Sequence, residues 1–99
     1  MMLGSELRPM AFDWDKKKAA ENLLKHGVSF DEAATVFNDP LYVDFYDPDH
    51  SIGEHRFIIM GESAQGRLLM VSYTERGEMI RLISARELTT TERKMYEEG

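Results

Sequence analysis

The stretch Lys25-His26-Gly27-Val28-Ser29-Phe30 ends one helix and begins another, and it sets the order of the elements around it. Gly27 can adopt the left-handed conformation that terminates a helix. Ser29 is a suitable N-cap, and a glutamate three residues later can complete a capping box. The junction therefore holds a lysine and a histidine at a helix C-terminus, where the helix dipole favours cations and where they can handle a phosphate group.

The residues before this junction are expected to form an amphipathic helix over 16–26, which Asp13 or Asp15 can cap. Its apolar stripe, expected to face the core, consists of Ala19, Ala20, Leu23 and Leu24. A different face carries Lys18, Asn22 and Lys25, which are spaced at i, i+4 and i+7.

Strand and turn patterns occupy most of the remaining chain. A short strand is expected over 11–14, a second helix over 31–37, four strands over 41–46, 55–61, 67–75 and 79–85, and a helix opened by the capping box Thr89–Glu92. Consecutive hairpins imply a mostly antiparallel sheet with the helices on one face. The sequence therefore predicts an α+β fold with a short N-terminal strand, two helices, a four-stranded antiparallel meander and a C-terminal helix.

Composition limits the class of protein. The length of 99 residues fits one domain, predicted over 11–98 after a flexible tail over 1–10. The chain has no cysteine, no signal-peptide pattern at its start and no apolar run of the roughly 20 residues that span a bilayer. These features predict a cytoplasmic protein that makes no use of a membrane.

The net charge of −6 argues against a nucleic-acid ligand, but the charges are unevenly distributed. Residues 1–30 carry a net charge of +1, residues 31–64 carry −7 and residues 65–99 are neutral. The acidic middle can serve a basic protein partner, or it can be a solvated loop. The cations near both ends can converge in the fold.

Metal-free chemistry on a phosphate ester requires a base for the attacking hydroxyl, a cation for the crowded phosphate and an acid for the leaving oxygen. Histidine and arginine suit these tasks. The chain offers His26, His50 and His55, together with Arg56, Arg67, Arg76, Arg81 and Arg86.

The positions of these arginines on the predicted strands restrict their roles. Arg76 lies in a hairpin turn, where its side chain is free to contact a ligand. Arg81 and Arg86 are five residues apart, so they share a face only if the strand ends or bulges between them. Arg56 shares a face with apolar residues, which places it at the sheet rim or beside a carboxylate such as Glu54 or Asp44.

Many short motifs, in order and at the right distances, resemble BrnT-type ribonuclease toxins. They are Phe12-Asp13-Trp14-Asp15, Asn22, residues 25–30, Glu32-Ala33, Val36-Phe37, Asp39-Pro40, Asp49-His50-Ser51, Glu54, Arg56, Gly66-Arg67-Leu68-Leu69, Thr74-Glu75-Arg76 and Ile83-Ser84-Ala85-Arg86. The resemblance covers residues 11–98 and implies a RelE-like fold. It assigns functional weight to Lys25, Arg56, Arg76 and Arg86 by motif position.

The resemblance implies an endoribonuclease toxin that uses no cofactor and cuts cellular RNA by attack of the 2′-hydroxyl, without a metal. A BrnA-type antitoxin would neutralise it in a heterotetramer of two toxins and two antitoxins, and only the antitoxin would contact DNA. The predicted catalytic residues are Lys25, His26, Arg76 and Arg86, and the predicted RNA-binding residues are Lys18, Arg56 and Arg81. A general-base role for His26 is inferred from its chemistry, and Glu54 and Tyr96 are the other candidate bases.

Each prediction has an alternative. His26 and Lys25 can be capping or surface residues, and Arg86 with Glu92 can brace the last helix. The segment 47–55 holds Asp47, Asp49, His50, Glu54 and His55, which can bind a metal, although their spacing matches no rigid ligand motif. The protein can also be a catalytically inactive binding module of a toxin–antitoxin complex. Enzymatic function requires that Lys18, Lys25, Arg76, Arg81 and Arg86 converge in one cleft.

Overall fold

The computed structural model describes residues 11–98, so the tail predicted over 1–10 lies outside the described residues. The elements are β1 (Ala11–Asp13), α2 (Lys16–His26), α3 (Phe30–Thr35), the 3₁₀ turn η1 (Val36–Asn38), β2 (Val43–Tyr46), the 3₁₀ turn η2 (Pro48–His50), β3 (Arg56–Glu62), β4 (Leu68–Arg76), β5 (Met79–Glu87) and α4 (Thr90–Glu98). None of the helices within 11–98 is long and apolar enough to cross a membrane.

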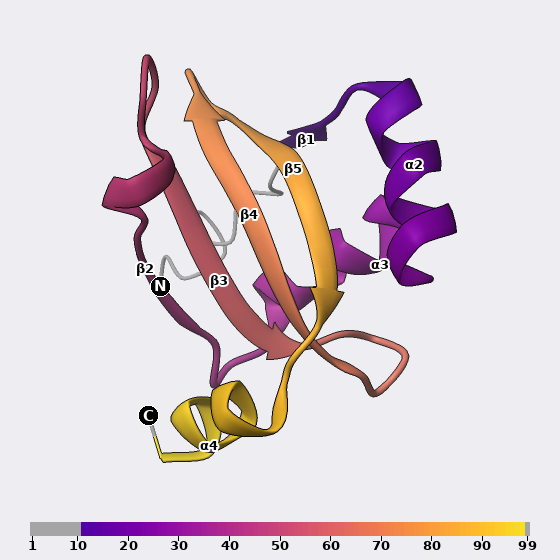
Figure 1. The fold of residues 1–99 in the computed structure, drawn as a ribbon, viewed down its shortest axis with the longest axis vertical. Helices are drawn as coiled ribbons and strands as arrows, with labels where there is room; N and C mark the ends of the chain where they lie inside the picture. Colours follow the sequence, from indigo (N-terminus) through magenta and orange to yellow (C-terminus); the bar gives the residue numbers. More distant parts are fainter. Residues whose placement is uncertain (1–10, 99) are drawn as a thin grey trace, which may run out of the picture.

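The predicted α+β fold is confirmed. Strands β2 to β5 form the antiparallel meander, and β1 joins it as a fifth strand, parallel to β5, in the order β1-β5-β4-β3-β2 (Figure 1). Because β4 and β5 lie inside the sheet, their long strands can be apolar on both faces. The short edge strands β1 and β2 close the sheet on its two sides.

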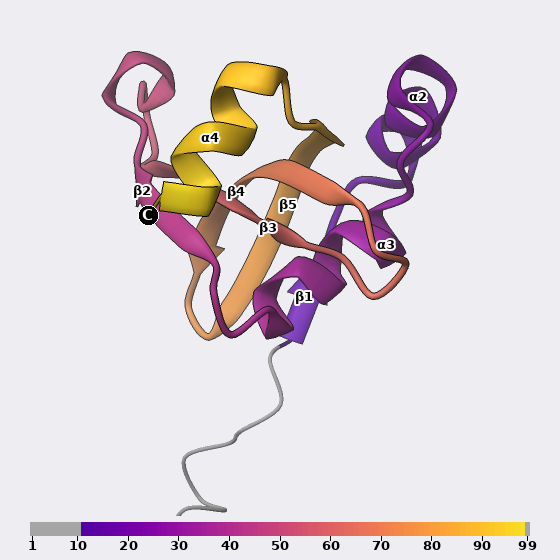
Figure 2. The same cartoon turned by 90° about the horizontal axis from the view of Figure 1, so that it is seen from below.

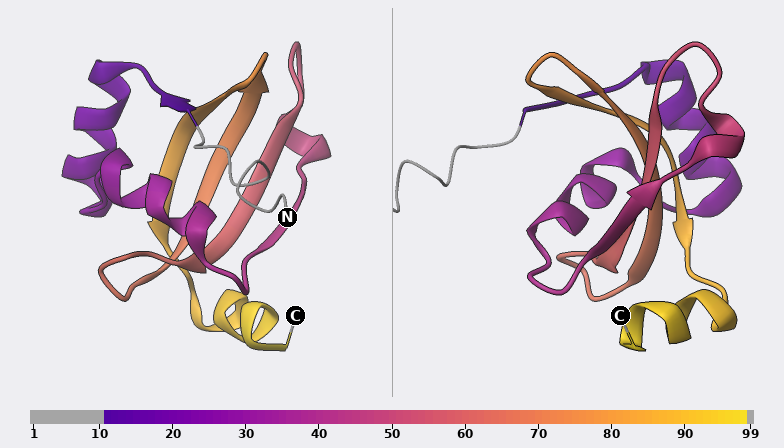
Figure 3. Two further views of the ribbon diagram at one scale, coloured as in Figure 1. Left: turned by 180° about the vertical axis from the view of Figure 1, so that it is seen from behind. Right: turned by 90° about the vertical axis from the view of Figure 1, so that its left-hand side faces the viewer.

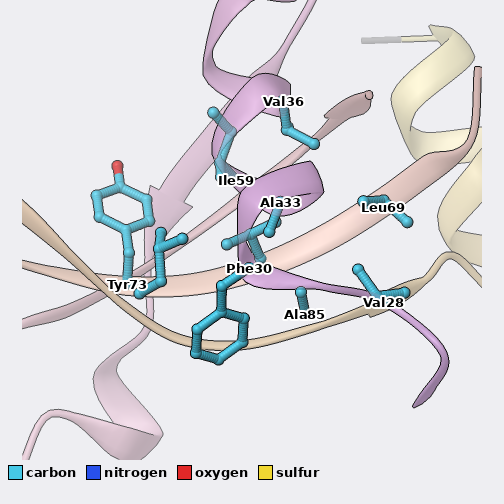
Figure 4. Packing of buried hydrophobic residues seen from close by; sticks show 10 residues of the cluster. Val28, Phe30, Ala33, Val36, Ile59, Leu69, Tyr73 and Ala85 are labelled. Carbon is cyan, nitrogen blue, oxygen red and sulfur yellow. The ribbon is translucent and has the colours of Figure 1, made fainter. Parts of the chain in front are cut away.

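The helices do not all cover one face of the sheet. Helix α3 and η1 pack on the face that holds the main core, which includes Phe30, Ile59 and Leu82 (Figures 3 and 4). Helix α2 runs beside β5, and α4 lies on the opposite side of the sheet from α3, at one end (Figure 2). The face between α2 and α4 is therefore left open for a ligand.

The α2–α3 junction forms as predicted, with one change. Gly27 has a φ of 69° and donates its N–H to the Leu23 carbonyl, and Ser29 Oγ accepts from the Glu32 N–H at 3.0 Å. The Glu32 carboxylate does not complete the capping box. It is buried and accepts hydrogen bonds from Arg67 and Ser63, which fixes the junction to the β3–β4 loop.

The predicted apolar stripe of α2 is wrong for both leucines, although Ala19 packs against the core. Leu23 is 51% exposed and Leu24 is 90% exposed, whereas Asn22 is only 7% exposed. The Asn22 amide donates to the carbonyls of Val28 and Ala85 at 3.0 and 2.8 Å, and its oxygen accepts from the Ala85 N–H at 3.1 Å. These three bonds turn the polar face of α2 toward β5, so the leucines point away.

A bulge in β5 brings two arginines to the same face. Ser84 pairs with Ser72 and Leu82 pairs with Tyr73, so the register shifts and Ile83 is the extra residue. Because the partners of Arg86 and Arg81 are Met70 and Thr74, which lie on one face of β4, both arginines point to that face. The condition that the sequence imposed on these arginines is therefore met.

Candidate functional site

A small cavity lies on the open face, and its lining includes residues at the end of the sheet where β4 turns into β5. Its volume is about 140 Å³. Its cations are Lys18 from α2, Arg56 from β3, Arg76 from β4 and Arg81 from β5. Asp15, Glu54 and Thr74 also line it. We call this cavity the cationic pocket.

Positive charge prevails in the cationic pocket, because four cations face two carboxylates. Arg76 pairs with Glu54 at 3.3 Å, and Arg81 pairs with Asp13 at 3.0 Å. Within residues 11–98, no carboxylate pairs with Lys18 or Arg56. These two cations therefore remain available for an anionic ligand.

The two carboxylates of the cationic pocket, Asp15 and Glu54, have different hydrogen-bond partners. Asp15 caps α2, accepting from the backbone N–H groups of Lys17 and Lys18, and these bonds lower the pKa of its carboxyl group. Among residues 11–98, the Glu54 carboxylate accepts a side-chain hydrogen bond from the Arg76 guanidinium alone. Glu54 is therefore the carboxylate of this pocket that can act on a ligand.

Lys25 and His26 lie in an adjoining groove rather than in the cationic pocket. The groove, about 230 Å³ in volume, runs between α2 and β5, and Lys18 and Ile83 line both cavities. Lys25 and His26 lie toward the C-terminal end of α2 and Lys18 near its N-terminal end. A ligand that extends along α2 can contact both cavities.

Arg86 does not line the cationic pocket and lies near the end of β5, the strand that precedes α4. Its guanidinium donates to both Glu92 carboxylate oxygens at 2.8 and 2.9 Å. The Arg86 hydrogen bonds lower the pKa of Glu92 to about 2. This geometry favours the alternative in which Arg86 braces the last helix.

Tyr96 is poorly suited to act as a base. Its hydroxyl donates to Asp39 Oδ2 at 2.7 Å, and this hydrogen bond raises the pKa of Tyr96 to about 12. The bond also anchors α4 to Asp39, in the segment before β2.

The alternative metal site receives no support from the described residues. Asp47 Oδ2 accepts a hydrogen bond from His50 Nδ1 at 2.9 Å, while His55 Nδ1 lies 3.1 Å from the Tyr46 hydroxyl. Throughout 11–98, no three histidine or carboxylate groups gather as a metal site.

The cations expected to share one cleft do so only in part, since Lys18, Arg76 and Arg81 line the cationic pocket, whereas Lys25 lies in the adjoining groove and Arg86 lies elsewhere. From the sequence, Glu54 was a candidate base, and Thr74 had no assigned role. Thr74 is buried at 2% exposure and donates its hydroxyl to the His55 carbonyl at 2.6 Å. The signal available in the sequence was position, since Glu54 lies two residues before β3 and pairs with Arg76, the last residue of β4, only after the sheet has formed.

Comparison with known proteins gives one consistent result. Residues 14–92 match the model of a family described as "Ribonuclease toxin, BrnT, of type II toxin-antitoxin system". The crystal structure of the Brucella abortus ribonuclease toxin BrnT aligns with a TM-score of 0.64 and 21% identity, over 83% of this chain and 100% of that one. At this identity the alignment shows a shared fold. No curated protein sequence matches the chain significantly.

Proposed function

Since this chain belongs to the BrnT family of ribonuclease toxins from type II toxin–antitoxin systems, we propose that it is an endoribonuclease that cuts cellular RNA and inhibits growth. The observation that carries the proposal is the cationic pocket. Four strands or helices each contribute one cation to it, in a chain whose net charge is −6. Such a concentration of positive charge fits the phosphate of an RNA backbone.

The proposed reaction is attack of a ribose 2′-oxygen on the adjacent phosphorus, without a metal. The P–O5′ bond breaks, and the products are a 2′,3′-cyclic phosphate and a 5′-hydroxyl. Arg56 and Arg76 stabilise the charge that develops on the phosphate oxygens, while Lys18 and Arg81 hold the RNA. Glu54, among these cations, takes the 2′-hydroxyl proton.

The groove beside α2 supplies the remaining predicted residues. Lys25 contacts a neighbouring phosphate, and His26 returns a proton to the leaving 5′-oxygen. The catalytic role of Arg86 stays a prediction, since its ion pair with Glu92 occupies its guanidinium. A ligand would have to displace Glu92 to recruit it.

The partner in this proposal is a BrnA-type antitoxin, with two toxins bound to one antitoxin dimer and with DNA contacted through the antitoxin alone. The family is part of a type II system, in which a protein antitoxin neutralises the toxin. The setting of the reaction is the cytoplasm, where both RNA and the antitoxin are made.

The test is induced expression in a bacterium, with and without the neighbouring gene, followed by electrophoresis of total RNA. Growth arrest with RNA loss, reversed by the neighbouring gene, is the expected result. Purified protein should cut RNA in the presence of a chelator and leave cyclic phosphate ends. Normal growth and intact RNA with a folded protein would favour the catalytically inactive binding module.

Variants of Arg76 and Arg86 distinguish the catalytic contributions of the cationic pocket and of the end of β5. Arg76→Ala should lower kcat by about 100-fold, as expected for loss of one charge-stabilising donor. Arg93→Ala, on exposed α4, is the matched control and should retain activity. The double variant Arg76→Ala with Arg86→Ala should abolish growth inhibition, and full inhibition by it would refute the proposed site. Comparison of the double with Arg76→Ala alone measures what Arg86 adds.

A further inference from the structure

A second cavity adjoins the cationic pocket at the rim of the sheet. Its volume is about 410 Å³, within the range of about 300 to 1,000 Å³ that holds small organic ligands. It is lined by Glu54, His55, Phe57, Thr74, Glu75 and Arg76. We call it the rim cavity. Glu54, Thr74 and Arg76 line both cavities, so these three residues separate two adjoining spaces.

The two cavities open on different faces of the sheet. Phe57 and Glu75 alternate along their strands with Arg56 and Thr74, which belong to the cationic pocket, so their side chains leave from the opposite face. The ion pair between Glu54 and Arg76 lies between these openings. A ligand that occupies both must bend around this pair, as a nucleotide does between its phosphate and its base.

The rings of Phe57 and His55 line the rim cavity, and two tyrosine rings pack against them. Phe57 stacks on Tyr73, with ring centroids 5.5 Å apart and planes at 26°. Tyr46 contacts both Phe57 and His55, with centroids 5.7 and 5.6 Å apart. The row ends at His55, whose side chain is exposed. Unpaired RNA bases stack on aromatic surfaces of this kind.

Glu75 supplies the polar part of the rim cavity. An exposed carboxylate beside a phosphate site repels the RNA backbone, so it weakens binding unless it accepts hydrogen bonds from another part of the ligand. The edge of a guanine base presents N1–H and N2–H side by side, which match the two oxygens of one carboxylate. Adenine, cytosine and uracil have no such pair of adjacent donors.

Building on the proposed function, we propose that the rim cavity binds a guanine base of the RNA, stacked against His55 and hydrogen-bonded by Glu75. The guanosine is the nucleotide whose 2′-hydroxyl attacks. In a nucleotide the ribose lies between its base and its 3′-phosphate, and Glu54 lies between the rim cavity and the cationic pocket. Glu54, the general base that takes the 2′-hydroxyl proton, therefore lies beside the ribose of the bound guanosine.

The test uses four oligodeoxynucleotides that each contain a single ribonucleotide, so that only one bond can be cut. The oligonucleotide with riboguanosine should be cleaved with a kcat/KM at least about tenfold above the other three, as expected for one bidentate base contact. Glu75→Gln should remove most of this preference. His55→Ala should lower kcat/KM for all four substrates, because stacking does not depend on base identity.

Two controls and a binding assay complete the test. Glu98→Gln and His50→Ala change the same residue types at exposed positions away from both cavities, and should keep the wild-type preference. Calorimetry with the four 3′-mononucleotides should show 3′-GMP binding most tightly, with the preference lost in Glu75→Gln.

The outcomes separate the two proposals. Equal cleavage of all four substrates with equal nucleotide binding overturns the base assignment, and preference for a base other than guanine overturns the choice of guanine. Absence of cleavage with selective binding of 3′-GMP supports the rim cavity and contradicts the proposed function. Absence of both contradicts both proposals.

Discussion

At the scale of single residues, the two side chains that fix the helices are polar. Asn22 was singled out by its place in the motif pattern, yet its burial was not predicted. Glu32 was predicted to cap a helix, yet its carboxylate binds Arg67 instead. Asn22 binds Ala85 and Glu32 binds Arg67, which lie 63 and 35 residues away along the chain. Local periodicity carries no information about such partners, so these roles could not be predicted from the sequence.

Asn22→Ala should lower the free energy of unfolding by about 3 kcal/mol, because it leaves the buried backbone groups of Ala85 and Val28 without partners. Denaturant unfolding measures this change. Asn22→Asp has nearly the same shape but cannot donate to the two carbonyls, so it should be destabilising as well. The neighbouring Glu21→Ala should change stability by less than about 0.5 kcal/mol. A stable Asn22→Asp variant would contradict the hydrogen-bond explanation.

At the scale of elements, the helix and strand order was predictable, but the arrangement around the sheet was only partly so. The capping box at Thr89 and Glu92 forms, with hydrogen bonds of 2.9 and 3.2 Å. The bulge in β5 was identified only as a condition on Arg81 and Arg86. Its position at Ile83 depends on the register with β4, which no single strand encodes. Placement of α4 depends likewise on contacts of Glu92 and Tyr96 with distant elements.

The attachment of α4 should depend on pH through Glu92. Its folded-state pKa of about 2 is below the ordinary value of 4.5, mainly because of the Arg86 hydrogen bonds. A depressed carboxyl pKa stabilises the fold above the ordinary value, and this contribution disappears as pH falls from about 4.5 through about 2. Because Arg86 is partly exposed, solvent screening limits the contribution of the Glu92 carboxylate to the free energy of unfolding to about 2 kcal/mol at neutral pH.

Glu92→Gln provides the measurement. At pH 6 the variant should unfold about 2 kcal/mol more easily than the wild type, and the difference should vanish as the pH approaches 2. Glu97→Gln, on the same helix, is the control and should follow the wild type at every pH. A difference that stays constant with pH would mean that Glu92 stabilises α4 by packing rather than by charge.

At the scale of the whole molecule, charge is divided between two regions. The net charge of −7 over residues 31–64 lies largely in the segments from α3 to β3, whereas α2, β4 and β5 supply most cations of the open face. The sequence predicted this division, and the fold explains it. Strand β2 forms one edge of the sheet and keeps the acidic segment apart from most of the cationic pocket. Only Glu54 and Arg56 bring this segment into the site.

The β2 edge should receive the antitoxin. Among the strands of residues 11–98, β2 pairs on one side only, and acidic residues lie along this segment at Asp44, Asp47 and Asp49. The side chains of Leu41 and Phe45 are 71% and 39% exposed. These features fit an extended basic segment with apolar side chains, added as a sixth strand. Phe45→Lys puts a cation where such a segment would bind, so it should weaken the complex at least tenfold, or about 1.4 kcal/mol.

The matched control is Leu24→Lys, which changes another exposed apolar residue, on α2, to the same cation. Binding of the purified antitoxin, measured by calorimetry at two salt concentrations, should be weakened by Phe45→Lys and unchanged by Leu24→Lys. Affinity for the wild type should fall as salt rises, because the acidic edge attracts the basic segment. RNA cleavage by both variants should equal that of the wild type, since neither residue lines the cationic pocket or the rim cavity. If Leu24→Lys alone weakens the complex, the antitoxin binds α2, and the acidic edge must be explained by solubility instead.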